Sequence, residues 1–405
     1  MNLRFSICKK YLCGRRLIMK ILFYSDTVFN FGGVQRVLAE IAKSLSKTQD
    51  VTILTIDTGK DISMYGYDQS AVKFDFISYP SRKGVENLIC KGYSFFYKKW
   101  LPHNKYTSAV YAHSFFLPTY KRKLVAKVNE GSYDVVIGVH AYFSLHLAAV
   151  RKWIHAKTVL GWMHNSYEAF FEKENPYLPH LKDFFAYGMV KLDKILVLSH
   201  TDKKKYEEWL GLRPEVIYNP LTVEVRGRAD LGSKRFLSVG RFSKEHKGFD
   251  LLIKAFAQFA EKDAEWMLDI VGGGTEEEVY RSLIKANNLE DRISIHPFTS
   301  EIHQYYARSS VYVLASRWEG MPLVLMEAMA YGLPIVASDI PIAKELLEGE
   351  GMAMLFEKEN ISQLADCLNS MATNVTLNRM SEKSVAYAEK FKIDAIIKQW
   401  EKILN

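Results

Sequence analysis

Two successive series of short apolar runs alternate with helix-forming segments, and this repetition constrains the fold more than any other feature of the chain. The runs are rich in β-branched residues, as strands buried on both faces of a sheet are. The first series lies at residues 20–25, 51–57, 72–78, 134–139, 158–163, 194–198 and 216–218, and the second near 236–240, 267–272, 292–296, 311–315, 334–338 and 352–356. Strands that alternate with helices form parallel sheets, so we predict an α/β protein with two doubly wound, Rossmann-like parallel sheets.

The length of 405 residues also exceeds what one hydrophobic core usually serves. Residues 219–235 are polar, contain proline and glycine, and read as a linker. We expect a first domain at 19–222, a second at 223–385 and a helical segment at 386–405. Ligands of doubly wound sheets bind beyond the carboxyl ends of the strands, so the site is expected in the cleft between the domains. Residues 1–18 lack the apolar stretch of a signal peptide and are predicted to be a loose extension before a natural start at Met19.

The net charge of +8 is unevenly distributed, with excess bases in the first half and excess acids in the second. Two stretches of the first half, Lys91–Leu101 and Tyr120–Lys123, mix aromatic and basic residues, which suits an anionic membrane surface. An ordinary mixed helix surface is the alternative, and nucleic acid is not expected because no nucleic-acid motif accompanies the charge. No apolar run is long enough to span a membrane, and the four cysteines are too scattered for a disulfide framework or a zinc site. We expect a cytoplasmic protein, peripheral on the inner face of the plasma membrane.

Two glycine clusters follow predicted strands. Gly32 and Gly33 lie between the first strand and the first helix, where glycine lets a ligand approach the backbone beneath a helix N-terminus. Glycine that serves turn geometry alone is the alternative. Gly272 and Gly273 begin a Gly-Gly-Gly run, after which Thr275 and Glu278 have the spacing of a capping box. Because acidic residues crowd that helix start, we expect a base or sugar there and not a phosphate.

Cations follow the first strand of the second series. Arg241 and Lys247 flank its loop and can grip a diphosphate, Arg as a planar fork and Lys as a point charge. Two solvated surface cations are the alternative, and His246 beside them is expected to be of that surface kind. The helix start at Met321–Leu323 has no acidic residue nearby beyond Glu319, so it suits a phosphate. No Asp-x-Asp pair occurs in the sequence, so side-chain cations, with no metal, are expected to neutralise the diphosphate.

A single charge, Glu327, stands within the apolar run from Gly320 to Ala330, and Glu319 precedes it by eight positions. A buried carboxylate is costly unless something polar meets it. Glu327 therefore either pairs with an arginine in the core or, with Glu319, faces a ligand rich in hydroxyl groups. His164 ends another predicted strand, and a hydrogen-bonded core histidine is its alternative role.

These segments together resemble the retaining glycosyltransferases of family 4, which have the two-domain GT-B fold. The resemblance runs from Met19 to the C-terminus. It rests on Gly32-Gly33-Val-Gln-Arg36, Val239-Gly-Arg241 with Lys247-Gly248, the Gly272 loop, and above all Ser316–Ala330 with its Glu-x7-Glu spacing. Two positions depart from the family pattern. Gln35 stands where many relatives have Glu, and no glycine pair follows Ala337–Asp339, so no ligand role is carried over to Glu345.

The resemblance implies a role for each site residue. The second domain would bind a nucleotide sugar and the first an acceptor. Arg241 and Lys247 would neutralise the diphosphate, Glu319 would hold hydroxyls of the transferred sugar, and His164 would lie close to that sugar. The remaining donor-binding residues would be Gly32, Gly33, Gly272, Gly273, Gly320, Met321, Leu323 and Glu327, with Glu327 on the ribose. A final helix at Ser384–Leu404 would cross back to the first domain.

The expected function is transfer of a hexose, with retention, from a UDP-linked donor to a growing polysaccharide or lipid-linked glycan of the bacterial surface. A nucleotide-sugar epimerase of the same fold and a non-catalytic membrane-associated binding protein are the alternatives. A nicotinamide-dependent dehydrogenase would need Gly-x-Gly-x-x-Gly at the first helix, and Gly32-Gly33 does not supply it.

Overall fold

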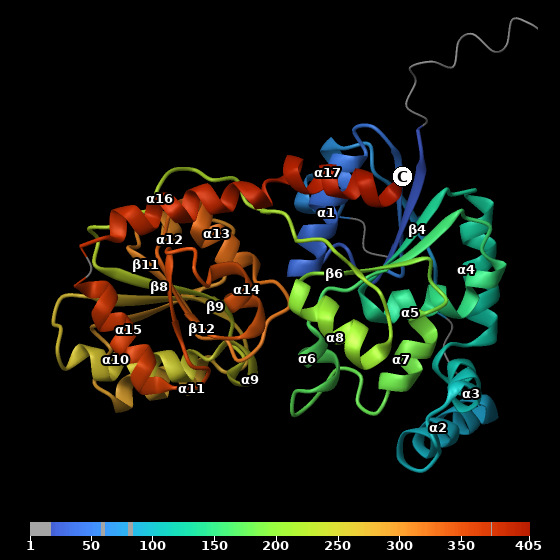
Figure 1. Ribbon diagram of the computed structural model, residues 1–405, viewed down its shortest axis with the longest axis horizontal. Coiled ribbons are helices and arrows are strands. Elements are labelled where there is room, and N and C mark those ends of the chain that lie inside the picture. Colours follow the sequence, from blue (N-terminus) through green and yellow to red (C-terminus); the bar gives the residue numbers. More distant parts are fainter. Residues whose placement is uncertain (1–17, 58–60, 80–83, 374) are drawn as a thin grey trace, which may run out of the picture.

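The computed structural model describes residues 18–57, 61–79, 84–373 and 375–405 (Figure 1). The predicted extension therefore lies outside the described residues, apart from Ile18. Two parallel sheets stand side by side, each covered by helices on both faces, which confirms the predicted fold class.

The first sheet has the order β3-β2-β1-β4-β5-β6-β7 among the described residues. Its strands are β1 Lys20–Ser25, β2 Asp50–Thr55, β3 Lys73–Phe76, β4 Val135–Val139, β5 Thr158–Trp162, β6 Lys194–Val197 and β7 Glu215–Val216. Alternate residues of β1 enter different cores, since Ile21 and Phe23 pack on one face of the sheet and Leu22 and Tyr24 on the other. Burial on both faces explains why these strands read as continuous apolar runs.

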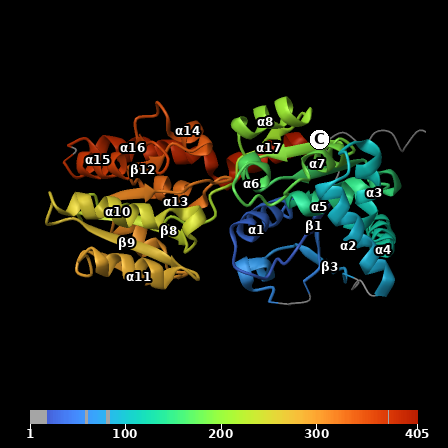
Figure 2. The same ribbon diagram turned by 90° about the horizontal axis from the view of Figure 1, so that it is seen from below.

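The helices of the first half connect these strands. They are α1 Gly33–Leu45, α2 Gly84–Lys99, α3 Lys105–Phe115, α4 Pro118–Glu130, α5 His140–Val150, α6 Tyr167–Phe171, α7 Lys182–Met189 and α8 His200–Leu210. Helices α2, α3 and α4 lie at the end of the molecule farthest from the second sheet, as Figures 1 and 2 both show.

The second sheet has the order β10-β9-β8-β11-β12-β13. Its strands are β8 Arg235–Arg241, β9 Met267–Gly273, β10 Ile293–Pro297, β11 Val311–Leu314, β12 Ile335–Ser338 and β13 Ala353–Phe356. Its helices are α9 Lys244–Lys247, α10 Phe249–Ala260, α11 Glu277–Ala286, α12 His303–Ala307, α13 Leu323–Tyr331, α14 Pro341–Leu347, α15 Ile361–Ala372 and α16 Leu377–Ala388. Within the described ranges, no helix is long and apolar enough to cross a membrane.

The predicted final helix, Ser384–Leu404, is in fact interrupted. Helix α16 ends at Ala388, a short 3₁₀ turn follows, and α17 Ile393–Leu404 begins after the extended Lys392. The Phe391 carbonyl accepts a hydrogen bond from the Leu221 amide (2.7 Å), so the chain turns where it meets the linker. Helix α17 then packs beside α1 on the first sheet, with Trp400 fully buried (Figure 1).

The predicted capping box after β9 is also wrong. The chain turns through Gly274 at φ 153°, and α11 begins only at Glu277. Glu276 holds the N-cap position and no side chain caps the helix, so Thr275 is one residue too early to serve. The acidic first turn of α11, with Glu277 and Glu278, is as the sequence indicates.

Candidate active site

Arg241 and Lys247 lie at the carboxyl end of β8 and behave differently. Arg241 is exposed, and no hydrogen bond or ion pair joins its side chain to another described residue. Lys247 is mostly buried, lies over Gly240, and its Nζ contacts Oε1 of Glu319 at 2.6 Å. The structure therefore brings Lys247 together with Glu319 and leaves Arg241 free to meet an anion.

Glu319 is held as an anion. Ser316 Oγ donates to its Oε1 (2.7 Å), and Nε2 of His246 lies 3.3 Å from its Oε2. Burial alone would raise the pKa of Glu319, but the charges of Lys247 and His246 outweigh it and hold that pKa far below its usual range. An ionised carboxylate can accept hydrogen bonds from several hydroxyl groups.

The expectation that His246 is a solvated surface residue is wrong. Its ring stacks on Trp318, with centroids 3.8 Å apart and planes 5° apart. Trp318 also meets Tyr177 of the first half, whose ring centroid is 5.9 Å away. The sequence carried no local signal for this stack, because its three rings come from separate segments.

Glu327 is almost fully buried and pairs with an arginine, as one of the two sequence readings expected. The partner is Arg36 of α1, on the other half of the molecule, whose Nη2 forms an ion pair with Oε1. The Tyr306 hydroxyl donates to Oε2 at 2.8 Å. Burial tends to lower the pKa of Arg36, but the Glu327 carboxylate more than offsets this and raises it. Arg36 also donates to Thr222 Oγ1 at 2.5 Å, so one guanidinium joins α1, the linker and α13.

His164 follows β5 and is buried, but its Nε2 has no hydrogen-bond partner among the described residues. It is therefore not the fully satisfied core histidine of the alternative reading. Burial, with a contribution from His140, lowers the pKa of His164 well below its usual value, so the ring is neutral. A Cβ at Gly320 would lie 2.7 Å from the His164 carbonyl, so Gly320 lets the second half pack directly against this residue.

His140 is a candidate site residue that the sequence did not reveal, and it acts electrostatically on His164. It begins α5 with φ 75°, and its Nε2 bonds the Asn165 amide at 2.8 Å. Burial lowers the pKa of His140 to about 4. A non-glycine residue in this region of backbone space is uncommon and often marks a functional site.

The predicted donor-site glycines other than Gly320 have different surroundings. A Cβ at Gly272 would lie 1.9 Å from the Gly240 carbonyl, so this glycine is needed for β8 and β9 to pack. A Cβ at Gly32 would collide with the side chain of Gln35. Gly273 has nothing within 4 Å of such a Cβ, and Gly33 has only Leu323, at 3.5 Å. Space for a ligand therefore exists at Gly33 and Gly273.

Two helix N-termini meet between the sheets. Helix α1 begins at Gly33 and α13 begins at Leu323, the residue that Gly33 faces. Neither helix has an acidic residue in its first turn, so both positive ends are available to an anion. The backbone at Gly320 and Met321 leads into the second of these ends. No group of three or more potential metal ligands occurs in the described part of the chain.

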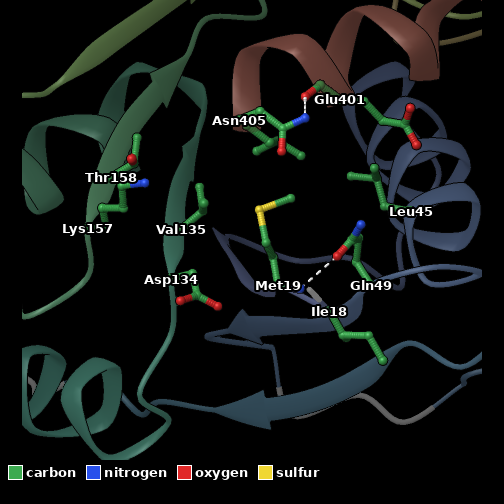
Figure 3. Close-up of a pocket in the computed structure, with 11 residues that line it drawn as sticks. Ile18, Met19, Leu45, Gln49, Asp134, Val135, Lys157, Thr158, Glu401 and Asn405 are labelled. Carbon is green, nitrogen blue, oxygen red and sulfur yellow. Dashed lines mark hydrogen bonds between the residues drawn. The ribbon is translucent and has the colours of Figure 1, made fainter. Parts of the chain in front are cut away.

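A pocket of about 420 Å³ lies elsewhere, at the amino ends of β1, β4 and β5 (Figure 3). Met19 donates its amide to Gln49 Oε1 there (2.7 Å), and helix α17 forms the opposite wall. This is the edge of the sheet opposite to the carboxyl ends, so the pocket is separate from the candidate site.

Known protein families match the chain along most of its length. A family model described as group 1 glycosyl transferases matches residues 224–390, and one described as glycosyltransferase family 4 matches residues 31–225. The chain is 33% identical over 390 residues to an uncharacterized glycosyltransferase of Haemophilus influenzae, covering 95% of this chain and 99% of that protein. It is 26% identical over 231 residues to an amylovoran biosynthesis glycosyltransferase of Erwinia amylovora, covering 55% of this chain and 64% of that one.

A solved structure has the same fold. The HepE protein of Anabaena, in complex with UDP and glucose, superimposes with a TM-score of 0.72. The two are 18% identical, and the match covers 95% of this chain and 99% of HepE.

Proposed function

The chain belongs to the group 1 glycosyltransferases of family 4, and from that premise we propose that it moves a hexose, with retention, from a UDP-sugar to a polysaccharide or lipid-linked glycan of the bacterial surface. One observation carries this proposal: Lys247, Glu319 and two acid-free helix N-termini converge at the carboxyl ends of both sheets. UDP is favoured as the carrier because HepE was solved with it. A surface glycan is favoured because the similar Erwinia amylovora protein acts in amylovoran biosynthesis.

The donor would lie with its diphosphate between Arg241, Lys247 and the backbone amides at the start of α13. Negative charge grows on the diphosphate as the sugar leaves, and preplaced cations and amides stabilise charge that develops in a transition state. Glu319, kept ionised by Lys247, would hold hydroxyls of the transferred sugar. The base or ribose would lie on the open backbone at Gly273.

Glu327 would bind the ribose hydroxyls, and Arg36 would keep it charged for that task. Each carboxylate oxygen can accept two hydrogen bonds, so the contacts from Arg36 and Tyr306 leave capacity for a hydroxyl. Glu327 is only 1% exposed, so the two halves must part enough to admit the ribose.

The first domain would bind the acceptor, and His164 would lie close to the transferred sugar. The His164 carbonyl lies against Gly320 and hence beside the place of the sugar. Its ring nitrogen Nε2 is unpaired and neutral, so it can form a hydrogen bond to a sugar hydroxyl as donor or acceptor.

Membrane docking would use the α2–α3 surface. Its exposed large apolar side chains are Val85, Leu88, Ile89, Phe95, Phe96, Trp100, Tyr106 and Val110. Lysines accompany them, with Nζ of Lys99 4.9 Å from the centre of the Phe95 ring and Nζ of Lys105 5.0 Å from that of Tyr106. Aromatic residues beside bases suit the interface of an anionic bilayer.

The test begins with thermal shifts in UDP-, GDP- and ADP-sugars, because a ligand of the native state raises its melting temperature without knowledge of the acceptor. Arg241→Ala and Lys247→Ala should each lower nucleotide release roughly a hundredfold, with Lys254→Ala, an exposed lysine of α10, as control. Normal turnover in both site variants, or no shift with any nucleotide sugar, contradicts the proposal.

Product analysis separates the alternatives. An epimerase would convert the nucleotide sugar without acceptor, whereas a transferase needs an acceptor to form product at full rate. A binding protein would release no nucleotide at all.

A further inference from the structure

A hollow of about 510 Å³ lies over helix α4. This helix is at the end of the molecule far from the second sheet (Figures 1 and 2). Pro118, Val125, Ala126 and Trp153 form its apolar floor. The hollow is distinct from the candidate active site, and nothing in the proposed transfer uses it.

The polar groups that line the hollow are all basic. They are His113, Lys121 and Arg122, and no carboxylate is among the lining residues. Lys152 adds a further cation at the Trp153 end, with its Nζ 4.3 Å from the centre of that ring. An apolar floor with a basic rim complements a molecule that has an apolar chain and an anionic head.

Lys121 is the unusual member of this group. Its side chain is nine-tenths buried, and its ammonium lies over the Phe116 ring, 5.7 Å from the ring centre. No described hydrogen bond or ion pair reaches this ammonium, so it has no anionic partner. Burial lowers the pKa of Lys121 to about 8, and the positive charge of Lys191 adds to this effect. A buried charge without a counter-ion costs stability, so it is expected where a ligand supplies the missing anion.

The length of the hollow fits a lipid chain. Residues 118–126 of α4 span about 12 Å at the rise of an α-helix. The exposed apolar residues of α2 and α3 lie at the same end of the molecule, where Trp100 is 75% exposed. A lipid drawn from a bilayer against that surface would have a short path to the hollow.

We propose that this hollow binds one anionic phospholipid, with the phosphate on Lys121 and Arg122 and an acyl chain along Val125, Ala126 and Trp153. This is a specific site for a single lipid molecule. It is independent of the sugar transfer and of the α2–α3 docking surface, since a lipid in free solution can fill it.

Calorimetric titration with dihexanoylphosphatidylglycerol below its micelle concentration tests the site without a bilayer. Its phosphodiester keeps one negative charge at all pH values used. We expect saturable binding of one lipid per protein, about tenfold weaker binding of dihexanoylphosphatidylcholine, whose chains are the same, and much weaker binding of inorganic phosphate. Equal binding of both lipids, or of phosphate alone, overturns the proposal.

Two variants of residues that line the hollow then test whether the lipid binds there. Lys121→Met removes the buried charge, and Ala126→Glu sets a carboxylate on the floor at an exposed position that tolerates it. Each should weaken phosphatidylglycerol binding about tenfold or more. The matched control is Lys123→Met, the same change at an exposed position of the same helix that does not line the hollow.

Two outcomes of these variants contradict the proposal. One is wild-type affinity in Ala126→Glu. The other is concentration-dependent self-association of the wild type, seen by sedimentation and lost in Ala126→Glu, which would make a second copy of the chain the occupant. Because no nucleotide sugar is present, failure here leaves the transferase proposal untouched.

Discussion

Single side chains join the two halves of the molecule, and Arg36 is the clearest case. Its ion pair with Glu327 joins residues 291 positions apart in the chain. The sequence predicted that Glu327 needs a polar partner, because a lone carboxylate on an apolar helix is costly. It could not identify the partner, since nothing local distinguishes Arg36 from other helix arginines. The stack of His246 on Trp318 was missed for the same reason.

Arg36→Ala should destabilise the protein by about 1–3 kcal/mol, because it leaves Glu327 charged and buried with only Tyr306 as partner. Chemical denaturation at pH 7 measures this. Arg281→Ala, which breaks an exposed pair with Glu277, should cost less than about 0.5 kcal/mol. Similar costs for the two variants would show that the Arg36 pair behaves as a surface pair.

Lys121→Met should stabilise the protein at pH 7, on the order of 1 kcal/mol, because it removes a buried charge that has no counter-ion. The folded-state pKa of about 8 lies below the unfolded value of 10.5. The charge on Lys121 therefore lowers the free energy of unfolding by its full amount below pH 8. As the pH rises from 8 to 10.5 the native lysine loses its proton first, and the advantage of methionine disappears.

Unfolding curves of both proteins at pH 7 and pH 9 check this prediction. Lys123→Met is again the control and should show neither the gain nor its pH dependence. A less stable Lys121→Met at pH 7 would mean that the lysine has a stabilising partner.

At the scale of elements, the strands were predicted to within two residues at every end, because strands buried on both faces appear as short β-branched runs. The helix ends were harder. The capping box failed because Gly274 turns the chain and delays α11, and the last helix failed because Phe391 is bound by the linker. Both errors come from contacts or backbone angles that no helical periodicity encodes.

The end of β9 offers a matched pair of glycine variants. Gly273→Ala should leave the melting temperature within a few degrees of wild type, since its Cβ meets no atom, yet weaken nucleotide-sugar binding by closing the open backbone. Gly272→Ala should lower stability markedly, because its Cβ would overlap the Gly240 carbonyl and separate β8 from β9. Thermal unfolding with and without UDP-sugar measures both, and unchanged ligand binding in Gly273→Ala would remove Gly273 from the site.

At the scale of the whole molecule, several side-chain contacts join the two halves, in addition to the packing of α17 on the first sheet. Besides Arg36 and Glu327, the Glu345 carboxylate accepts bonds from the backbone amides of His200 and Thr201 (2.8 and 2.9 Å) at the start of α8. The ring centroids of Phe31 and Phe298, one from each half, are 5.4 Å apart. No ligand role was carried over to Glu345 from the family pattern, and in the structure this residue joins the two halves. The predicted domain limits at 222 and 385 stay predictions.

Gly320→Ala should open the molecule. Its Cβ would press on the His164 carbonyl, so the two halves must move apart. We expect a larger radius of gyration in small-angle X-ray scattering and turnover reduced roughly tenfold or more, with the content of helix and strand unchanged. Gly232→Ala in the linker, where a Cβ has room, is the control. An unchanged radius of gyration with normal turnover would show that the contact yields locally.

The place of Trp400 has a consequence for how this protein is made. It lies between Phe23 and Trp162, with ring centroids 6.2 and 4.8 Å away, and is fully buried among residues of the first half. The first half of the chain is therefore synthesised early, but its hydrophobic core is incomplete until α17 leaves the ribosome. Nascent chains that still lack α17 would expose the apolar surface that Trp400 covers, and chaperones are expected to bind that surface during translation.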